Sequence, residues 1–267
     1  MEIQYTKAHG AGNDFLISPS VSTPTPELQQ IARALCERHT GIGADGWILL
    51  DNTKSADFDA AIRLFNADGS EAEISGNGTR CAAALLFSGD GATGAVRIST
   101  GAGVKHVRLI DRHGREFSFE MNMGLPQVLP GHICFPLPLA QGALDVTILN
   151  VGNPQCAVLV ERFPENWREI GAEIERHALF PKRTNVSFYR VMNANAIEAL
   201  FYERGVGETL SSGTGSTGAA SAAILRKVAS SPVRVITAVE DLHFRWDDSA
   251  YLTGPAEIVG VGTYYFD

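Results

Sequence analysis

The chain has 267 residues, of which 45% are hydrophobic and 19% charged, a composition typical of a globular protein with one large or two ordinary domains. Its net charge of −8 and its short, diluted basic stretches exclude a typical nucleic-acid-binding protein. No run approaches the roughly 18 apolar residues of a membrane span, and the first residues lack the features of a secretory signal. We therefore expect a cytoplasmic protein with neither a membrane nor a nucleic acid as partner.

Short β-prone runs recur along the chain, separated by glycine-rich turns. In chain order we expect strands at residues 46–50, 61–65, 95–99, 104–110, 116–121, 146–151, 157–160, 185–191, 197–202, 233–238, 243–246 and 256–262. Helical periodicity is rarer and predicts helices at residues 25–38, 78–88, 167–177 and 215–229. Many strands with few helices favour an α+β fold over a regular alternation of strands and helices.

One pattern occurs twice, 137 residues apart. Ser75 precedes a Gly-Asn-Gly turn and an alanine-rich helix, and Ser212 precedes a Gly-Thr-Gly turn and a helix of the same kind. Chance similarity between two glycine-rich turns is the alternative explanation. We interpret the pattern as two related halves that meet face to face, residues 1–118 completed by 256–267 and residues 119–255. Each half would present the N-terminus of a helix.

Two helix N-termini offer unpaired N–H groups and positive dipole ends, which favour a carboxylate ligand. They would also stabilise the negative charge that forms when the carbon beside that carboxylate loses a proton. Alternatively, the turns only close helices against strands. A third reading is a dinucleotide site, because Gly213–Gly218 matches Gly-x-Gly-x-x-Gly and Glu240 follows at a suitable distance, as does Asp241. Such a site needs a strand that ends at the first glycine, whereas the predicted strand ends near Glu203, so we disfavour it.

The four cysteines are scattered along the chain, at Cys36, Cys81, Cys134 and Cys156. They form no Cys-x-x-Cys pair and have no histidine at ligand spacing, so we expect no metal site. A cytosolic chain of this length does not need disulfides to hold its core. We expect all four to be reduced and most of them to be buried.

Eight motifs occur in an order that resembles one known family. They are His9–Phe15, Gly41–Gly46, Asn66–Glu73, Gly76–Cys81, Gly152–Pro154, Arg183–Asn185, Glu203–Thr209 and Gly213–Gly215. Together they resemble the diaminopimelate epimerase family over essentially the whole chain. The resemblance implies two pseudo-symmetric halves, each a strand-rich sheet wrapped round a central helix, with the active site in the cleft between them. It also implies a cytoplasmic amino-acid racemase or epimerase of lysine biosynthesis, independent of pyridoxal phosphate, of a kind that commonly forms homodimers.

Members of this family invert an amino acid without a cofactor. One cysteine thiolate removes the α-proton from one face, and a second cysteine returns a proton to the other face. In this chain the two cysteine positions hold Ser75 and Ser212. A histidine that assists the first cysteine is replaced by Gln155, whereas the glutamate partner of the second cysteine is kept as Glu203.

The resemblance places the remaining substrate contacts on residues that this chain keeps. They are the side chains of Asn13, Asn66, Asn153, Asn185 and Arg204 and the backbone donors of Gly76, Asn77, Gly213 and Thr214. The ligand it implies is a small amino acid, with no metal and no other cofactor.

The two serines decide what activity to expect. A hydroxyl is a far weaker acid than a thiol, whose pKa near 8.5 is readily lowered, so the chain as written should be nearly inactive as an epimerase. A deliberate double Cys→Ser substitution that traps substrate explains the serines, natural divergence explains Gln155, and the two can coexist.

Three functions therefore stay open. The first is an epimerase of diaminopimelate or a related amino acid, with cysteines at positions 75 and 212 in the parent protein. The second is a double-bond isomerase or tautomerase that uses Glu203 as its single base, similar to the phenazine-biosynthesis isomerases of the same fold. The third is a non-catalytic amino-acid-binding protein that has kept the substrate contacts.

Overall fold

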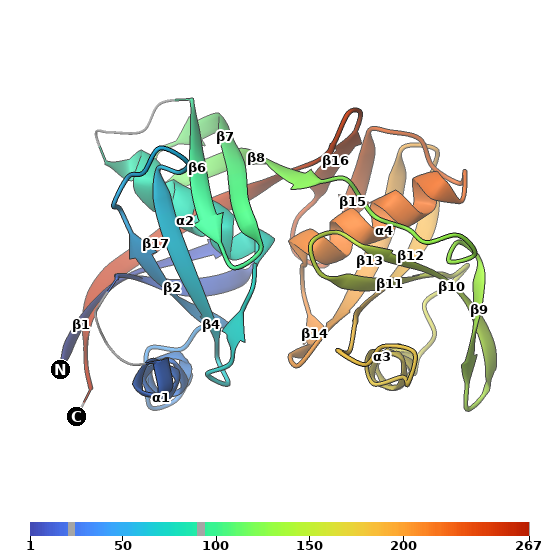
Figure 1. Cartoon of the computed structure of the whole chain (residues 1–267), viewed down its shortest axis with the longest axis horizontal. Helices are drawn as coiled ribbons and strands as arrows, with labels where there is room; N and C mark the ends of the chain where they lie inside the picture. Colours follow the sequence, from blue (N-terminus) through green and yellow to red (C-terminus); the bar gives the residue numbers. More distant parts are fainter. Residues whose placement is uncertain (21–24, 90–93, 267) are drawn as a thin grey trace. The chain divides into compact units, whose positions relative to one another are not determined.

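The computed structural model describes residues 1–20, 25–89 and 94–266, and these form two compact units. Unit 1 comprises Met1–Met121 together with the chain from Gly254 onward, and unit 2 comprises Asn122–Thr253. Both units are rich in strands and contain two helices each, as the α+β prediction requires (Figure 1). Among the described residues, no helix is long and apolar enough to cross a membrane.

Unit 1 is a closed barrel of eight strands. Its elements are β1 (Glu2–Gly10), β2 (Asn13–Pro19), α1 (Thr25–Cys36), β3 (Gly46–Asp51), β4 (Ala60–Asn66), β5 (Glu71–Ala72), α2 (Gly76–Ser88), β6 (Ala95–Thr100), β7 (Gly103–His113), β8 (Glu116–Gly124) and the second part of β17 (Ala250–Tyr265). Strand pairing runs in the order β17, β1, β2, β3, β4, β6, β7 and β8, and the pairing of β8 with β17 closes the ring. The β2–β3 and β4–β6 pairs are parallel.

Helix α2 fills the barrel of unit 1 and packs against β1, β2, β3, β4 and β6 (Figure 1). Its alanines, Ala82–Ala84, are fully buried, because only small side chains fit between a helix and strands on several sides. Gly78 is needed for the same reason, since a Cβ there would lie 3.1 Å from the Ile48 side chain and 3.3 Å from the Phe15 ring. The N-terminal end of α2 is therefore held close to the surrounding strands.

Unit 2 repeats this plan around α4 (Gly213–Leu225). Its other elements are β9 (Phe135–Leu139), β10 (Gly142–Asn150), β11 (Pro154–Leu159), α3 (Trp167–Glu175), β12 (Asn185–Asn193), β13 (Ala196–Glu203), β14 (Gly207–Thr209), β15 (Val233–Ile236), β16 (Leu242–Trp246) and the first part of β17. The β11–β12 and β13–β15 pairs are parallel, like their counterparts in unit 1. Helix α4 packs against β10, β11, β12, β13, β15 and β16, so the predicted pair of related halves is confirmed as a fold.

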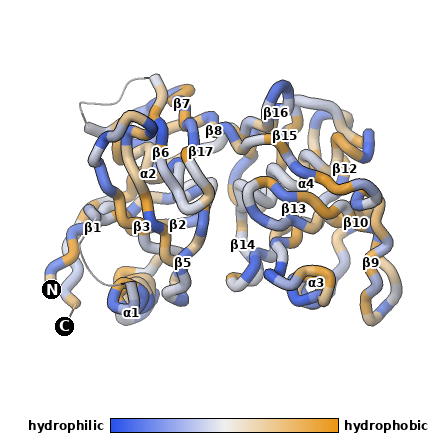
Figure 2. Tube along the Cα trace, in the orientation of Figure 1, coloured by the Kyte–Doolittle hydropathy of each residue, from blue (hydrophilic) through white to orange (hydrophobic). Residues whose placement is uncertain are grey.

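The two outer helices are amphipathic, in contrast to the two central ones. Figure 2 shows both hydrophobic and hydrophilic residues in α1 and in α3. The apolar face of α1 packs on Trp47 and Phe65 of unit 1, and α3 contributes Trp167 and Ile174 to the core of unit 2. The sequence periodicity of these two helices predicted their existence because one face of each is covered and the other is not.

The predicted helices are correct in number, but their ends differ from the prediction. Both central helices begin two residues before their predicted starts, at Gly76 and Gly213, because the Gly-x-Gly segment is itself the first helical turn. Helix α4 ends at Leu225 rather than at residue 229, because Lys227 has a φ of 60° and the N–H of Val228 turns back to the Ala223 carbonyl. Strands β1, β2, β5, β9 and β14 were absent from the prediction.

Candidate active site

Ser75 starts helix α2 of unit 1 as its N-cap. Its backbone is extended, and its Oγ accepts a hydrogen bond of 3.1 Å from the Gly78 N–H. A serine in this role satisfies one of the free donors of the first turn. The N–H groups of Gly76 and Asn77, both buried residues, donate to no group of the described chain. The first turn of α2 thus retains two open donors at the positive end of a helix dipole.

Asn13 and Asn77 lie against each other at the N-terminal end of α2. The Asn77 Nδ2 donates to the Asn13 Oδ1 at 3.3 Å, and the Asn13 Nδ2 donates to Asp45 at 2.6 Å. Arg80, which is fully buried, donates to the Asn77 Oδ1 and to the Pro255 carbonyl. The amide groups of Asn13 and Asn77 are therefore fixed in orientation by neighbours on both sides.

The aspartate that holds Asn13 belongs to a charged cluster on unit 1. Arg38 donates to both Asp14 and Asp45 at 2.8 Å, and the Lys7 ammonium lies 3.0 Å from Asp14. Burial acts to raise the pKa of Asp14, but the hydrogen bonds from Arg38 and Lys7 outweigh it and keep that pKa below 3.8. Asp45 lies in the Gly41–Gly46 motif, but the sequence predicted no role for it, because only the structure shows its contact with Asn13.

Asn66 makes a different kind of contact from the other predicted site residues of unit 1. Its Nδ2 donates to the Ser70 Oγ at 2.9 Å, and its backbone pairs with Ser70 and Gly69 in the turn after β4. No hydrogen bond joins it to Ser75, Asn13 or Asn77 among the contacts of the described residues. In this structure Asn66 acts as a turn residue.

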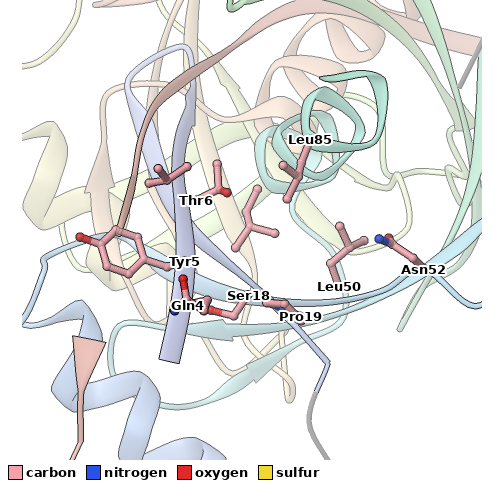
Figure 3. Close-up of a pocket in the computed structure, with 10 residues that line it drawn as sticks. Gln4, Tyr5, Thr6, Ser18, Pro19, Leu50, Asn52 and Leu85 are labelled. Atoms are coloured by element: carbon pink, nitrogen blue, oxygen red, sulfur yellow. The ribbon is translucent and has the colours of Figure 1, made fainter. Parts of the chain in front are cut away.

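A pocket of about 250 Å³ in unit 1 lies away from these residues (Figure 3). It is lined by Thr6, Ser18, Leu50 and Leu85, among others, and contains none of the predicted site residues. Leu85 is in the last turn of α2, whereas Ser75 caps the first. The pocket and the open helix donors are therefore separate features of unit 1.

Helix α4 of unit 2 begins in the same way, at Ser212. The Ser212 Oγ accepts a hydrogen bond of 3.0 Å from the Gly215 N–H, and its hydroxyl donates to the Glu203 carboxylate. Ser212 is only 2% exposed. The N–H groups of Gly213 and Thr214 donate to no group of the described chain, so this turn also keeps two open donors. A carboxylate beside Ser212 has no counterpart among the contacts recorded for Ser75.

Two amides and one hydroxyl form a row of hydrogen bonds between the start of β11 and the first turn of α4. Gln155 Nε2 donates to Asn153 Oδ1 at 2.7 Å, and Asn153 Nδ2 donates to the Thr214 Oγ1 at 3.2 Å. All three residues are buried. The sequence predicted Asn153 and Thr214 as ligand contacts, and the structure brings them into direct contact.

Asn185 and Arg204 meet at the hairpin between β13 and β14. The Arg204 N–H donates to the Asn185 Oδ1 at 3.0 Å, and the Asn185 Nδ2 donates to the Pro154 carbonyl at 3.1 Å. The next N–H, of Gly205, donates to the carboxylate of Glu175 at 3.1 Å. Glu175 is 2% exposed and was not predicted, because its contact with residue 205 spans 30 residues of sequence.

A sequence model of a family described as diaminopimelate epimerase matches residues 5–129 and 147–259 of the chain. The chain belongs to the diaminopimelate epimerase family. It is 36% identical over 280 residues to the diaminopimelate epimerase of Halothermothrix orenii, with 98% of each protein covered. It is also 36% identical to that of Moorella thermoacetica, covering 99% of this chain and 100% of the relative.

Solved structures of lower sequence identity share the fold. A probable proline racemase from Agrobacterium radiobacter superposes with a TM-score of 0.77 at 17% identity, covering 99% of this chain and 93% of that one. A phenazine biosynthesis protein of the PhzF family from Bacillus anthracis gives 0.70 at 15% identity, with both chains fully covered. At these identities the likeness concerns the fold alone.

Membership in the diaminopimelate epimerase family makes the chain an isomerase of the racemase and epimerase type. Within this diaminopimelate epimerase homologue, the predicted site residues gather by unit. Ser75, Gly76, Asn77 and Asn13 surround the N-terminus of α2. The contacts of unit 2 join Ser212 to Glu203, Thr214 to Asn153, and Arg204 to Asn185.

Proposed function

We propose that the chain binds an α-amino acid, diaminopimelate or a close relative of it, and that the first turns of α2 and α4 both donate to the substrate carboxylate. The observation that carries this proposal is the pair of serine-capped helices, each with two open N–H donors in its first turn. Helix N-termini of this kind bind anions by their free N–H groups and their dipole. The same donors would stabilise the enolate-like charge that forms when the α-carbon loses its proton.

The other predicted residues take their roles from this geometry and from the family. Arg204 is proposed to bind a carboxylate of the substrate, since its backbone is fixed by Asn185. Asn13 and Asn153 are proposed to donate or accept at the polar groups of the substrate, next to the helix turns. The proposed role of Asn66 at the substrate has the least support, because its hydrogen bonds among the described residues lie within a turn and none reaches Ser75, Asn13 or Asn77.

The proposed chemistry is a proton transfer on each face of the α-carbon, by groups at positions 75 and 212. Both positions hold serine, whose hydroxyl is too weak an acid to supply an efficient base at neutral pH. We therefore propose that the chain as it stands binds its substrate but inverts it very slowly. Whether the serines arose by divergence or by deliberate substitution does not change this expectation.

A second candidate function rests on the contact between Ser212 and Glu203. A carboxylate already hydrogen-bonded to a buried hydroxyl can move a proton by itself on one face, as a double-bond isomerase or tautomerase requires. The likeness of fold to the PhzF-family protein is compatible with it. A non-catalytic amino-acid-binding protein is the third outcome that the experiment distinguishes. A cytoplasmic location and a homodimer remain predictions from the sequence and the family.

The test is proton exchange in D2O, followed by NMR on L,L-diaminopimelate and a panel of other amino acids. The chain as it stands is compared with the Ser75→Cys, Ser212→Cys double variant. We expect exchange with inversion to rise by at least about 10²-fold in the double variant, the usual minimum for one positioned acid or base.

The other outcomes separate the alternatives. Exchange or double-bond migration without inversion, abolished by Glu203→Gln, supports the single-base isomerase. Saturable binding with no exchange in either protein supports the binding protein. Absence of binding by any amino acid of the panel contradicts the proposed function as a whole.

A further inference from the structure

We propose that Gln155 is a positioning residue for substrate binding, which orients the Asn153 amide so that the Thr214 hydroxyl is left to donate to the ligand. This inference rests on the proposed function, and it assigns a role to a residue that differs from the histidine expected by family resemblance.

The three side chains form one hydrogen-bonded chain in a buried setting. Gln155 is 1% exposed, Asn153 9% and Thr214 5%. The Gln155 Nε2 lies 2.7 Å from the Asn153 Oδ1, and the Asn153 Nδ2 lies 3.2 Å from the Thr214 Oγ1. Because all three side chains are buried, the directions of these hydrogen bonds are strongly coupled.

Gln155 sets the donor–acceptor direction of these hydrogen bonds. With the Gln155 amide nitrogen donating to the Asn153 oxygen, the Asn153 nitrogen must face α4 and donate to the Thr214 hydroxyl. That hydroxyl then accepts a hydrogen bond, and its own hydrogen has no acceptor among the contacts of the described residues. Thr214 consequently presents both its O–H and its backbone N–H as unused donors in the first turn of α4.

Unit 1 contains the corresponding arrangement with the opposite direction. There Asn13 donates to Asp45, so its oxygen faces the helix and accepts from Asn77, the second residue of α2. In unit 2 the orienting group is a donor, Gln155, and the second residue of α4 receives a hydrogen bond instead. The residue that orients each asparagine therefore sets the role of the helix residue beside it. Asn77 donates to its asparagine, whereas Thr214 accepts from its asparagine and keeps its own hydrogen for another acceptor.

Helix α4 holds Gln155 in place. A Cβ at Gly218 would lie 3.2 Å from the Gln155 Cβ and Cγ, so the absence of a side chain at Gly218 gives Gln155 its position against the helix. The Gln155 Oε1 is buried with no partner among the described residues. Rotating the Gln155 amide alone by a half-turn would bring its oxygen against the Asn153 oxygen, which is unfavourable, so the orientation of the Asn153 amide is coupled to that of Gln155.

Glutamine also removes a titration from this position. A histidine has an ordinary pKa near 6.5 and changes its hydrogen-bonding groups across neutral pH, whereas a glutamine amide stays a donor throughout. We therefore expect residue 155 to add almost no pH dependence to the affinity of this half of the site for an amino acid between pH 5.5 and 8.5.

The experiment measures the affinity of the full chain for diaminopimelate by calorimetry over that pH range. Gln155→Met keeps the volume and removes the donor, and we expect affinity to fall roughly 5-fold, the usual effect of one hydrogen bond. Gln155→Glu replaces the donor with an acceptor, so affinity should fall by more than about 10-fold at pH 8.5 and partly recover towards pH 5.5 as the carboxyl gains a proton. A merely structural role would produce no such recovery.

A matched control and a double variant complete the test. Thr147→Val removes the hydrogen bond that the buried Thr147 accepts from Arg226 at the other end of α4, and it should leave affinity unchanged. Thr214→Val should weaken binding, and adding Gln155→Met to it should weaken binding no further, because Gln155 acts through Thr214. Additive losses, or Gln155 variants that bind like the original chain, overturn the proposal.

A ligand-free measurement separates this proposal from the proposed function. The side-chain amide signals of Asn153 in NMR spectra should shift in Gln155→Glu but not in Thr147→Val. If the original chain binds no amino acid and this shift is present, the proposed function fails while the orienting role of Gln155 stands. If that shift is missing, the orienting role itself is wrong.

Discussion

Glu175 is predicted to hold the hairpin that carries Glu203 and Arg204, and Glu175→Ala tests this directly. The Glu175 carboxylate accepts from the Gly205 N–H at 3.1 Å, from Arg183 at 3.2 Å and from Arg176 at 3.2 Å. Its side chain is 2% exposed, whereas those of the two arginines are 53% and 69% exposed. The carboxylate is thus buried, but both ion pairs reach solvent.

The expected magnitude follows from these exposures. Each arginine pair contributes about 0–1 kcal/mol, because solvent screens the exposed guanidinium groups. The bond from the Gly205 N–H to a charged acceptor contributes about 1.5–3 kcal/mol. We therefore expect Glu175→Ala to lower the free energy of unfolding by about 1.5–5 kcal/mol. Glu175→Gln keeps an acceptor for Gly205 and should cost about 1 kcal/mol.

Urea unfolding of the original chain and the two variants measures both differences, and calorimetry with diaminopimelate measures affinity. Because Arg204 adjoins Gly205, affinity should fall in Glu175→Ala and be largely retained in Glu175→Gln. An alanine variant within 0.5 kcal/mol of the original chain would show that Glu175 does not hold the hairpin, since that figure lies well below the weakest outcome expected for Glu175. Equal damage by both variants would refute the importance of the Gly205 contact.

Three further predictions concern charge, thiols and helix capping. Asp14 has a lowered pKa, so its contact with Arg38 and Lys7 stabilises the fold above pH 3.8, and this contribution is lost as pH falls through the folded-state pKa. Asp14→Asn should therefore flatten that part of an acid-unfolding curve. An unchanged curve would contradict the assignment. Cys134 is exposed, whereas burial raises the pKa of the other three thiols. A thiol reagent at pH 7.5 should therefore modify one group quickly in the original chain and none in Cys134→Ser. Rapid modification of a second thiol would argue against the burial of the other three. Ser75→Ala should cost about 1 kcal/mol and Ser75→Gly only a few tenths by urea unfolding, and the reverse order would mean that the cap does not act as described.

The sequence predicted the two central helices and the relatedness of the two halves because the same short pattern occurs in both. A serine cap, a Gly-x-Gly turn and small side chains report directly on a helix surrounded by strands, so Ser75 and Ser212 could be placed from local residues alone. Strand β1 was missed because its exposed, half-buried and buried residues give no clean alternation.

The contacts that orient the site could not be predicted in the same way. Glu175 meets Gly205 over 30 residues, and Gln155 owes its position to Gly218, far along the chain. Such contacts depend on how strands bring distant segments together, and no local pattern encodes them. Family resemblance supplied the candidate residues, while the structure alone distinguishes Asn153, which is tied to α4, from Asn66, whose amide is engaged in a turn.

The central claim is that the first turns of α2 and α4 bind the same amino acid. An NMR titration of ¹⁵N-labelled chain with diaminopimelate tests it most directly, through the backbone amide signals of Gly76, Asn77, Gly213 and Thr214. These amides are the open donors of the two helices. We expect all four signals to move together and to saturate with a single dissociation constant. Signals that move in only one helix, or in neither, would contradict it.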